Sequence, residues 1–171
     1  MTRVAVIGNG ATGKTTFSRR LGGVTGLPVT HLDSIQFRPG WKVIAEEEFR
    51  TIHTPILSSA RWIIDGVAFP RTLPERLAAA DTVIFLDYSI FRIYWWALKK
   101  EAKYAFRQRP EMPPECPEWA ITWRLLKLIW VIHKKLRPGW LEQICSLPAG
   151  VAVHHLRHPR DAERLLRSAA G

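Results

Sequence analysis

The sequence "GNGATGKT" at residues 8–15 fits the spacing G-x-x-x-x-G-K-S/T, and the segments on both sides suit the same local structure. The β-branched run "RVAVIG" (3–8) predicts a strand before it, and "KTTFSRRLGGVTG" (14–26) predicts a helix that ends at glycines. In such a loop the backbone N–H groups turn toward phosphate oxygens, and the helix N-terminus adds partial positive charge. The stretch therefore predicts a nucleotide-binding phosphate loop.

Two side chains of this loop have specific expected roles. Lys14 is expected to reach the β- and γ-phosphates, and the Thr15 hydroxyl to ligate Mg²⁺. The nucleotide-binding residues expected from the loop and the first helical turn are Gly8, Asn9, Gly10, Ala11, Thr12, Gly13, Lys14, Thr15 and Thr16. The loop alone leaves open whether the phosphate is hydrolysed, held as a switch or transferred.

Outside the loop, short apolar runs alternate with helical patterns along the 171 residues. Alternation of this kind predicts an α/β fold in one domain (1–171), with a parallel sheet and right-handed crossovers. Strands are expected at 28–33, 61–66, 81–87 and 150–156, and helices at 45–60, 73–80, 89–107, 117–136 and 159–170. Pro55 is expected to disturb or end the helix at 45–60.

A helical insert at 88–140, divided by the proline-rich stretch 109–118, interrupts the strand–helix rhythm. We expect it to form a mobile lid over the carboxyl ends of the strands, where open α/β sheets bind ligands. It holds eleven Lys and Arg against four Glu, a net charge of +7 out of the chain's +10, and six of the eight tryptophans. Such a segment can bind nucleic acid, close over a polyphosphate and an aromatic ring, or form a solvated helical layer.

The remaining composition predicts a cytoplasmic protein. A monomer or a homodimer is expected, and the sequence does not decide between them. Cys116 and Cys145 have no metal-ligand spacing, as expected for thiols in a reducing compartment. No signal-peptide pattern opens the chain. The longest apolar stretch (120–132) is interrupted by Arg124 and Lys127 and is too short to span a bilayer, so no membrane association is expected.

The motifs of hydrolytic and switching nucleotide-binding proteins are missing from the sequence. It has no N-K-x-D motif, which GTPases use to read guanine. Its two strand-end aspartates are followed by Gly66 and Tyr88, whereas remodelling ATPases place a catalytic glutamate there. These absences weaken hydrolysis and switching as interpretations.

Transfer of the phosphate to an acceptor has direct support from the acidic strand ends. Asp33 is expected to end the second strand, where its carboxylate can orient an acceptor hydroxyl or accept its proton. The alternative for Asp33 is an N-cap of the next helix. Phe37 and Trp41 follow and are expected to floor an acceptor pocket. Asp65 is the better candidate to bind Mg²⁺ through water, and Asp87 is its competitor.

Two arginines at the edge of the proline-rich break are candidate catalytic groups. Arg107 and Arg109 lie in "AFRQRPEM" (105–112). Phosphoryl transfer spreads negative charge over the equatorial oxygens, and arginines that close over them stabilise it. The alternative is that both are solvated surface residues.

These motifs together resemble the adenylate-kinase-like P-loop kinases, and among them the FlaR-type "DNA topology modulation" proteins. The resemblance is carried by "GNGATGKTT", "LPVTHLDSIQFRPGW", "RWIIDG", "RTLPERLAAADTVIFLD", "RQRPEM" with "CPE" after it, and "HLRHPRDAERLL". It implies a three-layer sandwich with a five-stranded parallel sheet in the order 2-3-1-4-5. It also implies ATP, Mg²⁺, an acceptor site near Asp33 and Asp65, and arginines from a lid. Because the third strand then neighbours the first, it favours Asp65 over Asp87, and it places Arg157 and Pro159 against the adenine.

The sequence departs from the family pattern around the expected acceptor site. Val67–Ala68 follows "IIDG", Ser89 replaces a usual proline, and Trp96 replaces a basic residue. Adenylate kinases have the sequence "DGFPR", whose arginine binds the phosphate of the mononucleotide. Here two inserted residues give "DGVAFPR", so Arg71 matches that arginine only in part. These changes indicate an acceptor other than AMP.

The sequence thus predicts an ATP- and Mg²⁺-dependent phosphotransferase that acts on a hydroxyl of a small molecule. Nucleosides, nucleotides, sugars and nucleoside-type antibiotics are the candidate acceptors, and the last would make it a resistance kinase. The alternative is a nucleic-acid-associated ATPase, which the charge supports but no DNA-reading motif does. A third possibility is a degenerate kinase that binds ATP without turnover.

Overall fold

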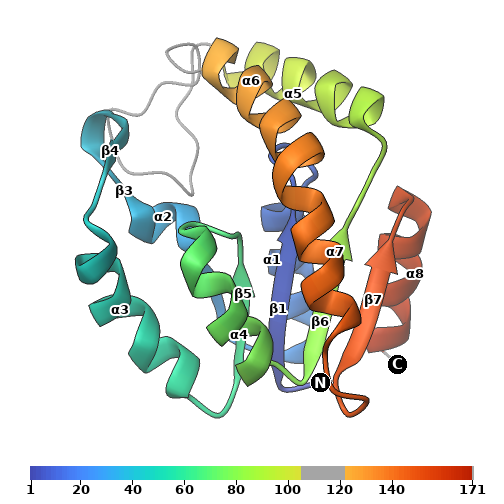
Figure 1. Cartoon of the computed structure of the whole chain (residues 1–171). Helices are drawn as coiled ribbons and strands as arrows, with labels where there is room; N and C mark the ends of the chain where they lie inside the picture. Colours follow the sequence, from blue (N-terminus) through green and yellow to red (C-terminus); the bar gives the residue numbers. More distant parts are fainter. Residues whose placement is uncertain (105–121, 171) are drawn as a thin grey trace.

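The computed structural model describes residues 1–104 and 122–170, which form a parallel sheet covered by helices (Figure 1). The sheet holds β1 (Arg3–Gly8), β2 (Val29–His31), β5 (Trp62–Asp65), β6 (Thr82–Leu86) and β7 (Ala152–Leu156) in the order β2-β5-β1-β6-β7. Counted along the chain, this is the expected order 2-3-1-4-5. Because β1 is the central strand, the phosphate loop that follows it begins at the middle of the sheet's carboxyl edge.

Helices cover both faces of the sheet, which confirms the expected three layers. Alternate residues of β1 point to opposite faces, so Val4 and Val6 are buried with α1 (Lys14–Thr25) and α8 (Pro159–Ala170). Ala5 and Ile7 are buried with the helices of the second face. These are α3 (Glu46–Ser58), α4 (Leu73–Ala79) and α7 (Arg137–Cys145).

The second strand is shorter than the sequence predicts, and Asp33 does not end it. His31 is the last residue of β2 that pairs with β5, and α2 (Leu32–Gln36) begins directly after it. Asp33 therefore lies in the first turn of α2, whose N-cap is His31. Burial of Leu32 against the second face holds this turn in place.

A small hairpin and an uninterrupted α3 are further differences from the sequence prediction. β3 (Phe37–Arg38) and β4 (Lys42–Val43) pair antiparallel around the turn η1 (Pro39–Trp41). Helix α3 runs through Pro55 and ends at Ser58. Pro55 lies on the exposed side of α3, where water can bind the carbonyl that proline leaves without a donor.

The insert continues further along the chain than the predicted boundary at 140. Its described parts are α5 (Ile90–Tyr104), α6 (Thr122–Val131), the π-helical segment η4 (Ile132–Leu136) and α7. In η4 the N–H of Arg137 bonds to the carbonyl of Ile132, five residues earlier. This wider turn precedes Pro138, which cannot donate a helical hydrogen bond. The proline-rich break lies outside the described residues.

The described insert helices are packed into the core rather than forming a separate lid. Ile93 and Ala97 of α5 and Ile129 of α6 are fully or almost fully buried in the same cluster as β1. Figure 1 shows α5 and α6 across the end of the sheet where β6 and β7 point. Movement of these helices as a whole would expose core side chains. No helix in the described parts of the chain is long and apolar enough to cross a membrane.

His53 of α3 is a buried titratable group outside the cavity described below. It is 1% exposed, and its ring stacks on Phe49 with 5.1 Å between the centroids. Its Nε2 has no hydrogen-bond partner among the described residues. Burial lowers the pKa of His53 to about 4; the positive charges of Arg76 and Arg50 act in the same direction, and Glu75 opposes them.

We expect His53 to make the folded state acid-sensitive between pH 6.5 and pH 4. The unfolded chain takes up a proton near pH 6.5 and the folded chain only near pH 4, so stability falls as the pH is lowered through this window. The loss is roughly 3 kcal/mol when complete. Urea unfolding from pH 7 to pH 4 measures it, and His53→Phe is expected to flatten this part of the profile. Equal pH profiles for the two proteins would refute the assignment.

Candidate active site

The phosphate loop owes its shape to glycines at two positions. Gly8 ends β1 with φ 153°, and a Cβ there would lie 2.6 Å from the carbonyl oxygen of Leu86, so β6 leaves no room for a side chain. Gly13 precedes α1 with φ 82°, in the left-handed region, and faces open space. The turn into α1, where a phosphate would lie, therefore has no side chain at Gly13.

Asn9 joins the loop to the insert, a role that the sequence does not reveal. Its side-chain amide donates to the carbonyl of Ile129 at 2.9 Å, and its Oδ1 accepts from the N–H of Gly10 at 2.7 Å. The Asn9 carbonyl accepts from Lys14 Nζ and from the Thr12 hydroxyl, both at 2.8 Å. The ammonium of Lys14 thus hydrogen-bonds to the loop itself.

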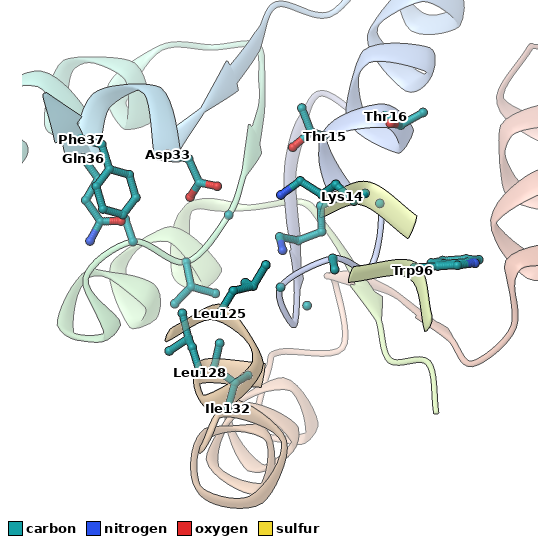
Figure 2. A pocket seen from close by; sticks show the side chains of 18 of the residues that line it. Lys14, Thr15, Thr16, Asp33, Gln36, Phe37, Trp96, Leu125, Leu128 and Ile132 are labelled. Carbon is teal, nitrogen blue, oxygen red and sulfur yellow. The ribbon is translucent and has the colours of Figure 1, made fainter. Parts of the chain in front are cut away.

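One cavity of about 750 Å³ extends from the phosphate loop across the carboxyl edge of the sheet. Figure 2 shows Lys14 and Thr15 on one side of it and Asp33 opposite, with its carboxylate directed into the space between them. The described lining residues are Gly8, Gly10, Ala11, Gly13, Lys14, Thr15, Thr16, Arg19, Asp33, Gln36, Phe37, Trp41, Gly66, Val67, Ala68, Pro70, Trp96, Lys99, Lys100, Leu125, Leu128, Ile132, Leu136 and Trp140.

Asp33 faces the phosphate loop even though it lies on a helix rather than at a strand end. Its Oδ1 lies 3.8 Å from the position of a Cβ on Gly66, just after β5. Phe37 and Trp41, from the small hairpin, line the same cavity and pack edge to face, with ring centroids 5.3 Å apart. The structure thus brings these three predicted residues to one cavity; their roles in catalysis and acceptor binding stay predictions.

The two candidate metal carboxylates have different surroundings. Asp87 accepts from Arg137 at 2.6 and 2.7 Å and from His155 at 2.7 Å, so both of its oxygens are bonded. Burial alone would raise the pKa of Asp87, but the hydrogen bonds from Arg137 and His155 outweigh it and lower the pKa. Asp87 therefore acts as an ionic link between β6, α7 and β7.

Asp65 keeps one acceptor oxygen without a hydrogen bond. It is 3% exposed at the carboxyl end of β5, beside β1. Its Oδ2 contacts His31 Nδ1 at 2.9 Å, whereas its buried Oδ1 has no partner among the described residues. An unpaired buried carboxylate oxygen is costly, so Asp65 Oδ1 can still accept a hydrogen bond, whereas both oxygens of Asp87 are bonded; Asp65 is not among the described residues that line the cavity.

Arg76 is a buried residue whose structural role the sequence analysis missed. It is fully buried in α4 and donates to the carbonyls of Gly66 at 2.6 Å and Val67 at 3.2 Å. Burial lowers the pKa of Arg76 to about 10, partly opposed by Asp65, so it is charged at neutral pH. It holds the loop after β5 in place. The helix pattern of "LPERL" contains no signal for this role.

Several predicted site residues do not line the cavity. Arg71 is exposed in the turn η2 (Pro70–Thr72), which argues against its role as a phosphate clamp in this cavity. Arg157 is exposed, and Pro159 is half-buried at the start of α8. Neither is a described lining residue, so their contact with adenine stays a prediction. Arg107 and Arg109 lie outside the described residues.

The residues around the cavity that the sequence analysis missed come mainly from the insert. Leu125, Leu128, Ile132, Leu136 and Trp140 line it from α6, η4 and α7. Their helical spacing predicts only an apolar face, which is typical of a core. By contrast, Val67, Ala68 and Trp96, which depart from the family pattern, do line the cavity.

Comparisons with known proteins bear on the fold. No protein-family model and no curated protein matches the sequence. Shikimate kinase from Acinetobacter baumannii, solved with shikimate, is 16% identical, with a TM-score of 0.61 over 98% of this chain and 90% of its own. The chain has the fold of P-loop kinases.

Two further solved structures share this fold over nearly the whole chain. A sugar kinase from Janibacter sp. is 18% identical, with a TM-score of 0.52 over 99% of this chain and 92% of its own. A protein from Chloroflexus aurantiacus that is described as a kinase is 20% identical, with a TM-score of 0.54 over 98% of this chain and 97% of its own. The comparisons give no support to the narrower resemblance to FlaR-type proteins.

Proposed function

We propose that this protein is an ATP- and Mg²⁺-dependent phosphotransferase that moves the γ-phosphate to a hydroxyl of a small molecule. The observation that supports this proposal most strongly is one cavity in which Lys14 and Thr15 of a phosphate loop face the carboxylate of Asp33. A site for hydrolysis alone needs no apolar and aromatic wall beside that carboxylate. The wall formed by Phe37 and Trp41 supports an organic acceptor.

The residues at the loop fit the triphosphate and its metal ion. Lys14 would leave the Asn9 carbonyl and bind oxygens of the β- and γ-phosphates. The Thr15 hydroxyl would hold Mg²⁺ directly, and the unpaired Oδ1 of Asp65 would accept from a metal-bound water. When bound, Mg²⁺ neutralises charge that develops on the phosphate oxygens.

Asp33 would act on the acceptor. Its carboxylate orients the acceptor hydroxyl and accepts its proton as the hydroxyl oxygen bonds to the γ-phosphorus and the bond to the β–γ bridging oxygen breaks. The apolar wall excludes water, which would otherwise take the phosphoryl group. Arg107 and Arg109 remain proposed stabilisers of the equatorial oxygens, and Arg157 and Pro159 proposed contacts to adenine.

A screen with γ-³²P-labelled ATP tests this function. Purified protein with Mg²⁺ is incubated with nucleosides, nucleotides, sugars and hydroxylated antibiotics, and labelled products are separated by thin-layer chromatography. Label is expected in an acceptor, with little in inorganic phosphate. Release of phosphate at the same rate with and without every acceptor would contradict a transferase.

A nucleic-acid-associated ATPase is the second candidate, and the exposed cation–aromatic pairs of the insert favour it. Lys99 lies over the exposed ring of Trp95 at 4.8 Å, and Lys134 over the exposed ring of Trp130 at 5.2 Å. Such pairs can stack on bases and attract phosphates. Stimulation of ATP hydrolysis by DNA or RNA would support this candidate. Binding that modest salt abolishes, without stimulation, would show charge attraction alone.

A further inference from the structure

We infer that the acceptor is an uncharged alcohol with an apolar ring or chain, rather than a phosphorylated, carboxylated or cationic molecule. This inference rests on the proposed function and narrows its acceptor class. It follows from which elements bring charged side chains, and which bring apolar ones, to the described lining of the cavity.

The positive charges of the described lining come from two helices. Every described lysine or arginine of the lining belongs to α1 or α5: Lys14, Arg19, Lys99 and Lys100. Figure 2 shows Trp96 of α5 on one side of Lys14 and the pair Gln36 and Phe37 on the other. The described lining of α2, the hairpin, the loop after β5, α6 and α7 contains no lysine or arginine.

The arginines that are close in sequence to the acceptor wall face solvent or bond to other groups. Arg71 is exposed and does not line the cavity. Arg38 pairs with Glu48. Arg50 bonds to Glu75 of α4 at 2.7 Å and to Glu46 of α3 at 3.1 Å. Arg76 points its guanidinium at backbone carbonyls. These guanidinium groups therefore do not supply the clamp that a phosphate or carboxylate on the acceptor needs.

The wall of the acceptor end is apolar apart from two side chains. Its described residues are Phe37 and Trp41 of the hairpin, Val67, Ala68 and Pro70 from the segment after β5, and Leu128 and Trp140 from the insert. The polar side chains of this wall are Asp33 and Gln36.

The energetic cost decides which acceptors fit this wall. An anion buried against it would lose its hydration without gaining a cation from the described residues of this wall, and it would be repelled by Asp33. A polycation would have only one carboxylate, that of Asp33, among the described residues of this wall to balance several positive charges. An uncharged ring would gain burial against aromatic side chains, while its hydroxyl would contact Asp33.

Matched acceptors test the inference. The pairs are 2-naphthalenemethanol with 6-(hydroxymethyl)-2-naphthoate, methyl shikimate with shikimate, and thymidine with thymidine 5′-monophosphate; kanamycin is the cationic member. Transfer from labelled ATP gives kcat/KM, and quenching of tryptophan fluorescence in the presence of Mg²⁺ and ADP gives binding without turnover. The neutral member of each pair is expected to exceed its charged partner at least tenfold in both measurements, with the naphthalene alcohol the best of the panel.

The outcomes separate this inference from the proposed function. Equal or better use of a charged member would overturn the acceptor class while leaving the phosphotransferase intact. Neither transfer to nor binding of any member would overturn the inference. Failure of the wider labelled-ATP screen as well would remove the proposed function.

A pair of leucines offers a matched test inside the protein. Leu128 lines the cavity and is 49% exposed, whereas Leu98 of α5 is 50% exposed and is not a lining residue. Leu128→Arg is expected to lower the neutral-to-anionic ratio of kcat/KM at least tenfold, because it adds a cation to the apolar wall. Leu98→Arg is expected to leave the ratio unchanged. Equal ratios in the two variants would overturn the assignment of this wall to the acceptor.

Discussion

Replacing Lys14 with alanine is expected to reduce phosphoryl transfer by about a thousandfold or more, the upper range for losing one group that stabilises transition-state charge. The ammonium of Lys14 lies in the cavity and bonds to the Asn9 carbonyl at 2.8 Å, from which a triphosphate can draw it. Because this contact is a single, partly buried hydrogen bond, its loss costs only about 1 kcal/mol of stability. Initial rates with labelled ATP and thermal unfolding measure the two effects.

Lys135→Ala is the matched control for the Lys14 variant. Lys135 is an exposed lysine of η4 that does not line the cavity, so its removal takes away the same charge without touching the site. We expect this control to transfer phosphate at the wild-type rate. Similar losses in the two variants would show that Lys14 contributes only through net charge, and the proposed donor site would be wrong.

Replacing Asp33 with asparagine is expected to lower transfer by about 10²- to 10⁴-fold, the usual contribution of a positioned acid–base group. The dissociation constant for ATP is expected to change by less than about twofold, because the Asp33 side chain faces the loop from α2 and belongs to the acceptor side of the cavity. Asparagine keeps the size of the side chain and removes its basicity. Single-turnover rates and nucleotide titrations separate the two quantities.

Glu47→Gln controls for the loss of one negative charge, since Glu47 is exposed in the first turn of α3 and is not a lining residue. Transfer by Asp33→Asn at the wild-type rate would show that the mechanism is wrong. ATP binding without transfer to any acceptor, in the wild type as well, would identify the degenerate kinase considered from the sequence.

Local patterns were sufficient for the phosphate loop and most of the strands. The spacing of glycines and Lys14 depends on contacts between residues close in sequence, which is why it can be read directly. Asp33 was predicted at a strand end and lies on α2 instead. It still faces the loop because β1 and β2, which precede the two sites, are parallel strands of one sheet with only β5 between them, so both end at the same edge.

Long-range packing distinguishes the two candidate metal carboxylates and sets the contacts of the phosphate loop, which the sequence did not reveal. Asp65 and Asp87 look alike as strand-end aspartates, but Arg137 and His155 come from distant segments and occupy only Asp87. Likewise, Asn9 bonds to a carbonyl 120 residues away. No periodicity in the sequence reports such partners.

The sequence by itself determined the phosphate-binding loop, the alternation of strands and helices, and the edge of the sheet where the site lies. These depend on backbone conformation, local hydrophobic period and the geometry of parallel strands, which a short stretch of residues sets. Only the tertiary structure decided that the insert helices join the core, that Arg76 is buried under the loop after β5, and that Arg71 faces solvent. The direction in which a charged side chain points depends on which distant segments exclude water from it, and this is a property of the packed fold.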